Sequence, residues 1–119
     1  MEFRRVVPLL AGLMGAFGVA AAAAASHGAD PRLLGGASAM CLAHAPALIA
    51  LTSAWERLRL AAASAVLLSL GTTLFAADLT MRHLAGHGLF LMSAPAGGVL
   101  MMLGWLTLAL GAFLPPKTT

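Results

Sequence analysis

Four long stretches of the chain are almost entirely apolar, and short polar segments separate them. They cover residues 6–25, 33–53, 58–77 and 94–114, and the one charged residue inside them is Arg59, near the start of the third. Each stretch is close to the roughly 20 residues that a helix needs to cross a bilayer. Unpaired backbone groups are costly in lipid, and the stretches do not alternate as barrel strands do. The pattern therefore predicts an all-α integral membrane four-helix bundle in one domain.

Composition supports this reading and excludes other classes of protein. The 119 residues are 61% hydrophobic and 9% charged, whereas soluble domains are about half apolar and about a quarter charged. Five of the seven cations flank apolar stretches rather than forming the basic face that a nucleic-acid partner requires. A single cysteine permits neither an intrachain disulfide nor a cysteine zinc cluster. We expect the lipid bilayer, and no nucleic acid, as a partner.

The first apolar stretch has a second interpretation. Its basic start at Arg4 and Arg5 and its small residues at 20–26 are equally typical of a cleavable signal peptide. Because Met1 is retained in the chain, we expect a first membrane span instead.

The distribution of cations predicts the orientation in the membrane. Four spans place both termini and the loop between the second and third spans on one side. That side carries five cations, namely Arg4, Arg5, Arg57, Arg59 and Lys117, and the other side carries two, Arg32 and Arg82. The positive-inside rule then predicts cytoplasmic termini in a multi-pass protein of the inner (plasma) membrane.

Small residues recur at every fourth position in three of the stretches, a spacing that lets membrane helices approach closely. The stripes are Gly12, Ala16, Ala20 and Ala24; Gly35, Ala39, Ala43 and Ala47; and Ala61, Ala65, Ser69, Thr73 and Ala77. We expect these faces, above all the third, to pack in a compact bundle. The segment 80–93 that follows the third stretch fits either a short helix on the membrane surface or an irregular loop.

His44 is the side chain with the clearest chemical potential, because it lies halfway along the second stretch. An ionisable residue at that depth is a candidate functional site, and a neutral imidazole can bind haem, a metal or a quinone carbonyl. Cys41, three residues earlier, falls on a similar helix face. The commoner role for such a histidine is a structural hydrogen bond between helices. Pro46 favours that role as well, because it leaves the carbonyl of Leu42 without its helical donor.

Three further histidines, His27, His83 and His87, fall in the two loops predicted to face outward. His83 and His87 are four residues apart, which places two metal ligands on one face of a helix. Gly86 and Gly88 weaken the helix assumption, and packing in the loop is the alternative. Asp78, the one acid near the end of a span, has Arg82 four residues later to neutralise it.

Several short motifs, taken in order, resemble a known family. They are Ser-His-Gly at 26–28, Met-Cys-Leu-Ala-His-Ala-Pro-Ala-Leu at 40–48, and Ser-Ala-Pro-Ala-Gly-Gly at 93–98. Their order and the chain length are similar to those of the domain of unknown function 423 family, small proteins expected to carry four spans. The chain departs from the pattern at Leu42 and Ala43, where an aromatic often precedes the histidine, at Pro46, and at Ala94, which replaces a threonine. The resemblance implies that the first stretch belongs to the mature protein, and it implies no activity.

The sequence contains no phosphate-binding glycine loop, no nucleophile paired with a base and no pair of catalytic carboxylates, so we expect no enzyme. Its small-residue stripes and short loops favour an accessory or assembly subunit that packs against other membrane-protein subunits. Binding or transfer of a small redox or lipophilic ligand (haem, metal or quinone) through His44 is one alternative. A homo-oligomeric transporter or channel is another.

Overall fold

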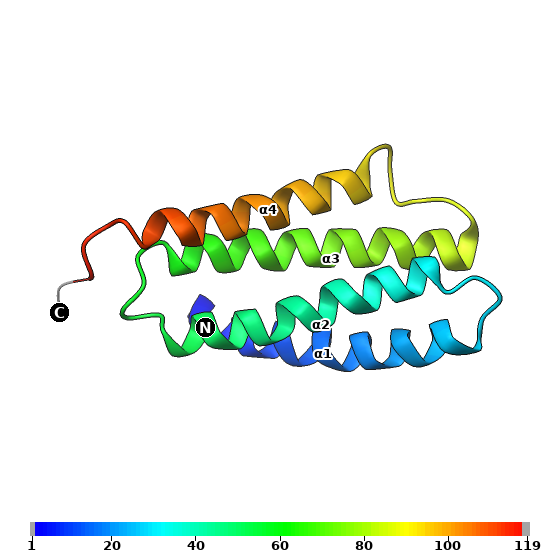
Figure 1. Ribbon diagram of the computed structural model, residues 1–119, viewed down its shortest axis with the longest axis horizontal. Coiled ribbons are helices and arrows are strands. Elements are labelled where there is room, and N and C mark those ends of the chain that lie inside the picture. The colour runs from blue at the N-terminus through cyan, green and yellow to red at the C-terminus, as the bar shows by residue number, and fades with distance from the viewer. Residues whose placement is uncertain (1, 118–119) are drawn as a thin grey trace.

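The computed structural model describes residues 2–117, and within that range it contains four long helices (Figure 1). They are α1 (Phe3–His27), α2 (Arg32–Ser53), α3 (Ala61–Ala85) and α4 (Ser93–Gly111). All four are long and apolar enough to cross a membrane. The predicted all-α membrane fold is therefore confirmed.

The helices run antiparallel and stack in chain order along a body of 53 × 26 × 24 Å (Figure 1). Each packs mainly on its neighbour in the sequence, and α1 also touches α3 over a short stretch. Among the described residues, α1 and α4 do not meet, because they lie on opposite sides of the α2–α3 pair. The two short dimensions are nearly equal, so the arrangement is a four-helix bundle, as the sequence predicts.

The packed face of α1 differs from the predicted small-residue stripe. Its buried positions alternate in steps of four and three, namely Val7, Ala11, Met14, Gly18, Ala21 and Ala25. All four residues of the predicted α1 stripe are exposed, as are Ala39 and Ala43 of the α2 stripe. In α3 the first three stripe residues are buried, but Thr73 and Ala77 are exposed. A step of four drifts by about 40° per turn, so an interface that stays on one face needs alternating steps of three and four.

Glycines bring the backbones of α3 and α4 close together. Gly97, Gly104 and Gly111 follow one another at seven-residue intervals and are all buried. A Cβ atom on Gly97 would lie 2.7 Å from the amide nitrogen of Phe75 and 2.8 Å from the carbonyl oxygen of Gly71. Ser64 donates a hydrogen bond across the same interface to the carbonyl of Gly104 at 2.9 Å. Backbone contacts between small residues therefore hold this helix pair together.

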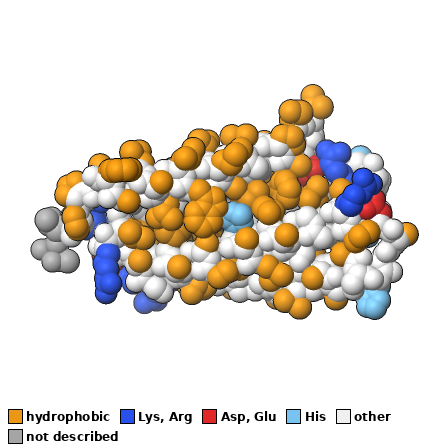
Figure 2. Space-filling view, viewed as in Figure 1, with side chains coloured by type: hydrophobic (Ala, Val, Ile, Leu, Met, Phe, Trp, Pro, Cys, Tyr) orange, Lys and Arg blue, Asp and Glu red, His pale blue; other side chains and the backbone are white. Residues whose placement is uncertain are grey.

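Charged side chains gather at the two ends, and hydrophobic side chains cover the middle of the face shown in Figure 2. The end with both termini and the α2–α3 loop, here called the terminal end, is closed by long-range contacts. Arg4 pairs with Glu56 at 2.9 Å, and Lys117 donates to the carbonyl of Trp55 at 2.8 Å. The opposite end, called the distal end, carries the α1–α2 and α3–α4 loops (Figure 1). Which end faces the cytoplasm stays a prediction from the distribution of cations.

The segment 80–93 is divided between a helix and an irregular loop. Helix α3 continues to Ala85 and ends at Gly86, whose left-handed backbone (φ 79°) lets its amide donate to the carbonyl of Arg82. Residues 86–92 form no helix, and Met92 also has a positive φ (67°) just before α4 begins. Helix α3 is thus several residues longer than α4 at the distal end.

Candidate functional site

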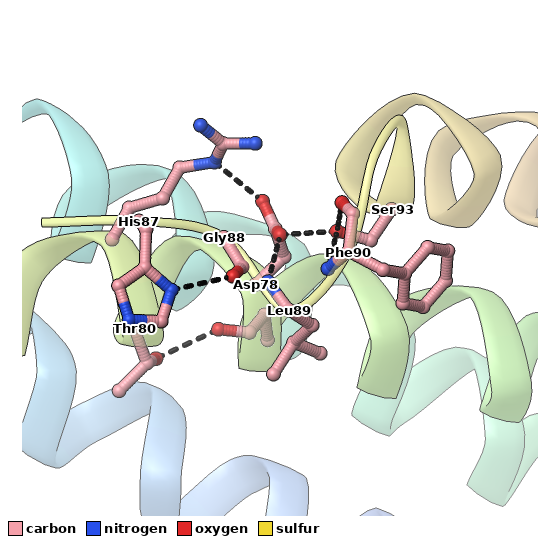
Figure 3. A network of polar contacts seen from close by, with 9 residues as sticks. Asp78, Thr80, His87, Gly88, Leu89, Phe90 and Ser93 are labelled. Carbon is pink, nitrogen blue, oxygen red and sulfur yellow. Dashed lines mark hydrogen bonds and ion pairs between the residues drawn. The ribbon is translucent and has the colours of Figure 1, made fainter. Parts of the chain in front are cut away.

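The most elaborate polar site surrounds Asp78, on the α4-facing side of α3 (Figure 3). The carboxylate is fully buried. Its Oδ1 accepts a hydrogen bond from the hydroxyl of Ser93, the first residue of α4, and another from the backbone amide of Leu89 at 2.9 Å. Its Oδ2 accepts a hydrogen bond from Nε of Arg82 at 2.7 Å. One side chain therefore joins α3, the α3–α4 loop and the start of α4.

The loop passes so close to this carboxylate that a side chain at position 88 would force the Asp78 and Arg82 side chains to shift. A Cβ atom on Gly88 would collide with Oδ1 of Asp78 and would lie 2.7 Å from Nη2 of Arg82. Ser93 is as fully buried as Asp78, so the pair offers no group to an external substrate. The arrangement satisfies a buried charge with three donors and holds the loop in place.

Sequence reasoning found part of this site. The i, i+4 spacing of Asp78 and Arg82 is visible in the sequence, and these two side chains do form an ion pair. The donors Ser93 and Leu89 were missed, because they lie 15 and 11 residues away and reach the carboxylate only after the loop folds back. The acid near the end of an apolar span is the feature of the sequence that could have indicated them, because a buried carboxylate requires hydrogen-bond donors.

His44 is buried in α2, and both of its ring nitrogens have partners. Nδ1 lies 2.7 Å from the carbonyl oxygen of Met40, and the indole Nε1–H of Trp105 on α4 donates to Nε2 at 3.0 Å. This arrangement defines a neutral imidazole that carries its proton on Nδ1. It joins α2 to α4 across α3, 61 residues apart in the chain.

Cys41 is also buried but faces a different region from His44. It lies in the floor of an apolar groove of about 470 Å³ between α1 and α3, and His44 does not line that groove. The walls come chiefly from Leu13 and Phe17 of α1 and from Thr73 and Met81 of α3. Both residues belong to the buried face of α2, but only Cys41 lines the groove.

The three loop histidines lie at the distal end and are exposed. His83 is in the last turn of α3, whereas His87 lies beyond Gly86, and its Nδ1 lies 2.9 Å from the carbonyl oxygen of Gly88, which can only accept a hydrogen bond. The helical spacing that motivated the metal prediction therefore does not hold between them. No cluster of three or more His, Cys, Asp or Glu suited to a metal ion occurs within residues 2–117.

Asp30, in the α1–α2 loop, also pairs with an arginine. Its carboxylate accepts hydrogen bonds from Nε and Nη2 of Arg32 at 3.0 and 2.8 Å and from the Arg32 amide at 3.0 Å. The side-chain hydrogen bonds with Arg32 contribute most to lowering the pKa of Asp30 to about 2, and the charge of His83 adds a small effect. The pair caps the first turn of α2.

Within the described residues, then, the fold defines a multi-pass membrane protein of four helices. Most of its buried polar side chains are hydrogen-bonded within the protein, and Oγ of Ser69 and Oγ1 of Thr72 are the buried side-chain atoms without a partner among these residues. The family model described as "Protein of unknown function (DUF423)" matches residues 12–98, a range that begins within α1 and ends within the first turns of α4. The chain belongs to this family, which confirms the resemblance seen in its motifs. No solved structure matches the chain.

Proposed function

We propose that this protein is a non-enzymatic accessory or assembly subunit of a larger complex in the inner (plasma) membrane, and that α1 is its docking helix. The observation that carries the proposal is the position of the α1 small-residue stripe. Gly12, Ala16, Ala20 and Ala24 are all exposed, on the side of α1 opposite its buried residues. Small residues at every fourth position thus face outward, where none of the four described helices covers them.

Such a face suits another transmembrane helix better than it suits lipid. Close approach of two helices over small residues gains backbone contacts that disordered lipid tails do not match. A Cβ atom on Gly12 would meet nothing within 4 Å, so the surface is open at this end of the stripe. The stripe runs from residue 12 to residue 24, twelve residue steps or about 18 Å of helix, which is enough for three turns of contact with a partner helix.

The test compares the natural protein with a blocked variant. Gly12→Leu combined with Ala16→Leu places two large side chains on the stripe without touching the buried face of α1. Met102→Phe on α4 is the control. It also enlarges an exposed side chain (59%), but on a helix that does not contact α1. Each protein is purified in mild detergent from its native membrane, and cross-links from α1 are mapped by mass spectrometry.

The proposal expects one stoichiometric membrane subunit cross-linked to α1, lost in the double variant and retained in Met102→Phe. A protein that runs alone, with no subunit enriched, contradicts it. So does a complex that contains only copies of this chain, since that result favours a homo-oligomer.

Ligand binding through His44 has less support. A haem, metal or quinone at Nε2 would first have to displace the indole of Trp105, because that nitrogen already accepts a hydrogen bond. Optical spectra and metal analysis of the purified protein, with His44→Ala for comparison, test this alternative. A transporter or channel would require several copies, and a flux assay in liposomes tests it.

A further inference from the structure

The α3–α4 loop ends in four consecutive apolar residues that are exposed in the described part of the chain, although the first of them, Leu89, also lines the groove between α1 and α3. Leu89, Phe90, Leu91 and Met92 are exposed by 42%, 57%, 90% and 61% respectively. We call residues 89–92 the apolar tip. In water, the exposure of four adjacent apolar side chains would be energetically unfavourable. A contiguous apolar surface of this kind marks a site of interaction.

The hydrogen bond between Asp78 and Ser93 fixes the position of the tip along the long axis of the bundle. Ser93, which begins α4, is hydrogen-bonded to Asp78, and α3 continues for seven further residues to Ala85. At 1.5 Å per residue, Ser93 lies about 10 Å below the distal end of α3. The loop therefore turns back down the side of α3, and the tip joins it to α4 at this lower level.

The tip also projects sideways. In Figure 1 the loop rises past the start of α4 to the edge of the molecule, at right angles to the long axis and set back from the end of α3. The space-filling view shows hydrophobic side chains protruding at this edge (Figure 2). They continue the exposed apolar face of α4, which includes Val99 and Leu103.

We propose that the apolar tip is an anchor inserted into the leaflet of the bilayer at the distal end, so that its partner is the lipid surface itself. The 19 residues of α4 span about 28 Å, close to the hydrocarbon thickness of a bilayer. The residues just before α4 then lie at the boundary between acyl chains and headgroups. The half-exposed guanidinium of Arg82 lies beside the loop, at a level where lipid phosphates are within reach.

Asp78 is the positioning residue for this anchor. It holds the loop at the amide of Leu89, where the tip begins, and at Ser93, the residue directly after the tip. The tip is therefore presented in a fixed orientation by a buried charge rather than tethered by a flexible segment. A rigid wedge of this kind sets the depth and rotation of the bundle in its leaflet.

The test places a nitroxide label at position 91 of the full chain in phosphatidylcholine and phosphatidylglycerol liposomes. Cys41→Ala removes the one native thiol, and Leu91→Cys, Leu103→Cys and His87→Cys are labelled in separate proteins. Collision rates are measured with oxygen, which concentrates in lipid, and with a water-soluble nickel chelate. Position 103 is the reference for lipid, and position 87, an exposed polar position in the same loop, is the matched reference for water.

We expect the ratio of oxygen to nickel accessibility at position 91 to be several-fold higher than at position 87 and to approach that at position 103. A ratio equal to that at position 87 places the tip in water and overturns the proposal. Low accessibility to both reagents also overturns it, because a protein partner or a second copy then covers the tip.

A second measurement tests the positioning role. Asp78→Asn keeps the size of the side chain but removes its charge. It should increase the mobility of the nitroxide at position 91 and lower its oxygen-to-nickel ratio, while the spectrum at position 103 is unchanged. Unchanged mobility at position 91 contradicts a role for Asp78 in holding the anchor, and a change at both positions shows general unfolding instead.

Discussion

Gly97→Ala is expected to separate α3 from α4, because the new methyl group meets backbone rather than flexible side chains. Its Cβ would lie 2.7 Å from the Phe75 amide nitrogen, 2.8 Å from the Gly71 carbonyl oxygen and 3.0 Å from the Phe75 Cα. Overpacking of this kind lowers the free energy of unfolding by about 1–3 kcal/mol. The higher helix propensity of alanine raises it by up to about 1 kcal/mol. We expect a net loss of about 1–2 kcal/mol, which lowers the folded-to-unfolded ratio roughly 5- to 30-fold.

The neighbouring Gly98→Ala is the matched control, since its Cβ would meet nothing within 4 Å. It has the same effect on helix propensity without the collision, so its stability should equal or slightly exceed that of the natural protein. The free energy of unfolding is measured by titrating sodium dodecyl sulfate into mixed micelles while helicity is followed by circular dichroism. If Gly97→Ala is as stable as Gly98→Ala, the inference that the backbones of α3 and α4 are in close contact at Gly97 is wrong.

Three further predictions concern the polar pairs. Asp78→Ala leaves buried donors unsatisfied and should cost about 1–3 kcal/mol, seen as faster proteolysis in the α3–α4 loop; an unchanged cleavage rate would contradict the site. For His44→Ala and Trp105→Phe, a double-mutant cycle should give a coupling of about 0.6 kcal/mol, typical of hydrogen bonds in membranes, and additive effects would exclude the bond. The carboxyl of Asp30 should titrate near pH 2 by nuclear magnetic resonance, and Arg32→Gln should raise that midpoint. Because the pKa is lowered on folding, this pair stabilises the fold above the unfolded-state pKa of about 3.9, and that contribution is lost as the pH falls towards 2.

The number and approximate position of the helices could be predicted from the sequence because crossing a bilayer imposes a local requirement. About 20 apolar residues must follow one another, and charges must lie between such runs. The ion pair of Asp78 with Arg82 was equally accessible, since a spacing of four places both on one helix face. The family was also recognisable, because its short motifs keep their order along the chain.

Which face of each helix is buried was decided by the tertiary structure alone. Alanine and glycine are so frequent that several faces of α1 carry small residues, and periodicity does not choose between them. The chain packs Val7 and Met14 inward and leaves Gly12 and Ala16 outside. Side-chain size alone does not explain this choice, because Leu9 and Leu13 also face outward while Ala11 and Gly18 are buried. The buried face is the one whose shape fits the surface of α2, and that fit exists only once the helices are packed.

The contacts between distant residues likewise required the fold. His44 and Trp105 meet because α2 and α4 flank α3, and Ser93 reaches Asp78 because the loop turns back along a longer helix. The sequence by itself determined four apolar helices with charged ends, since lipid acts on each segment separately. Only the tertiary structure decided how the polar groups are paired, because a buried group takes the donor that packing brings to it, whatever its distance along the chain.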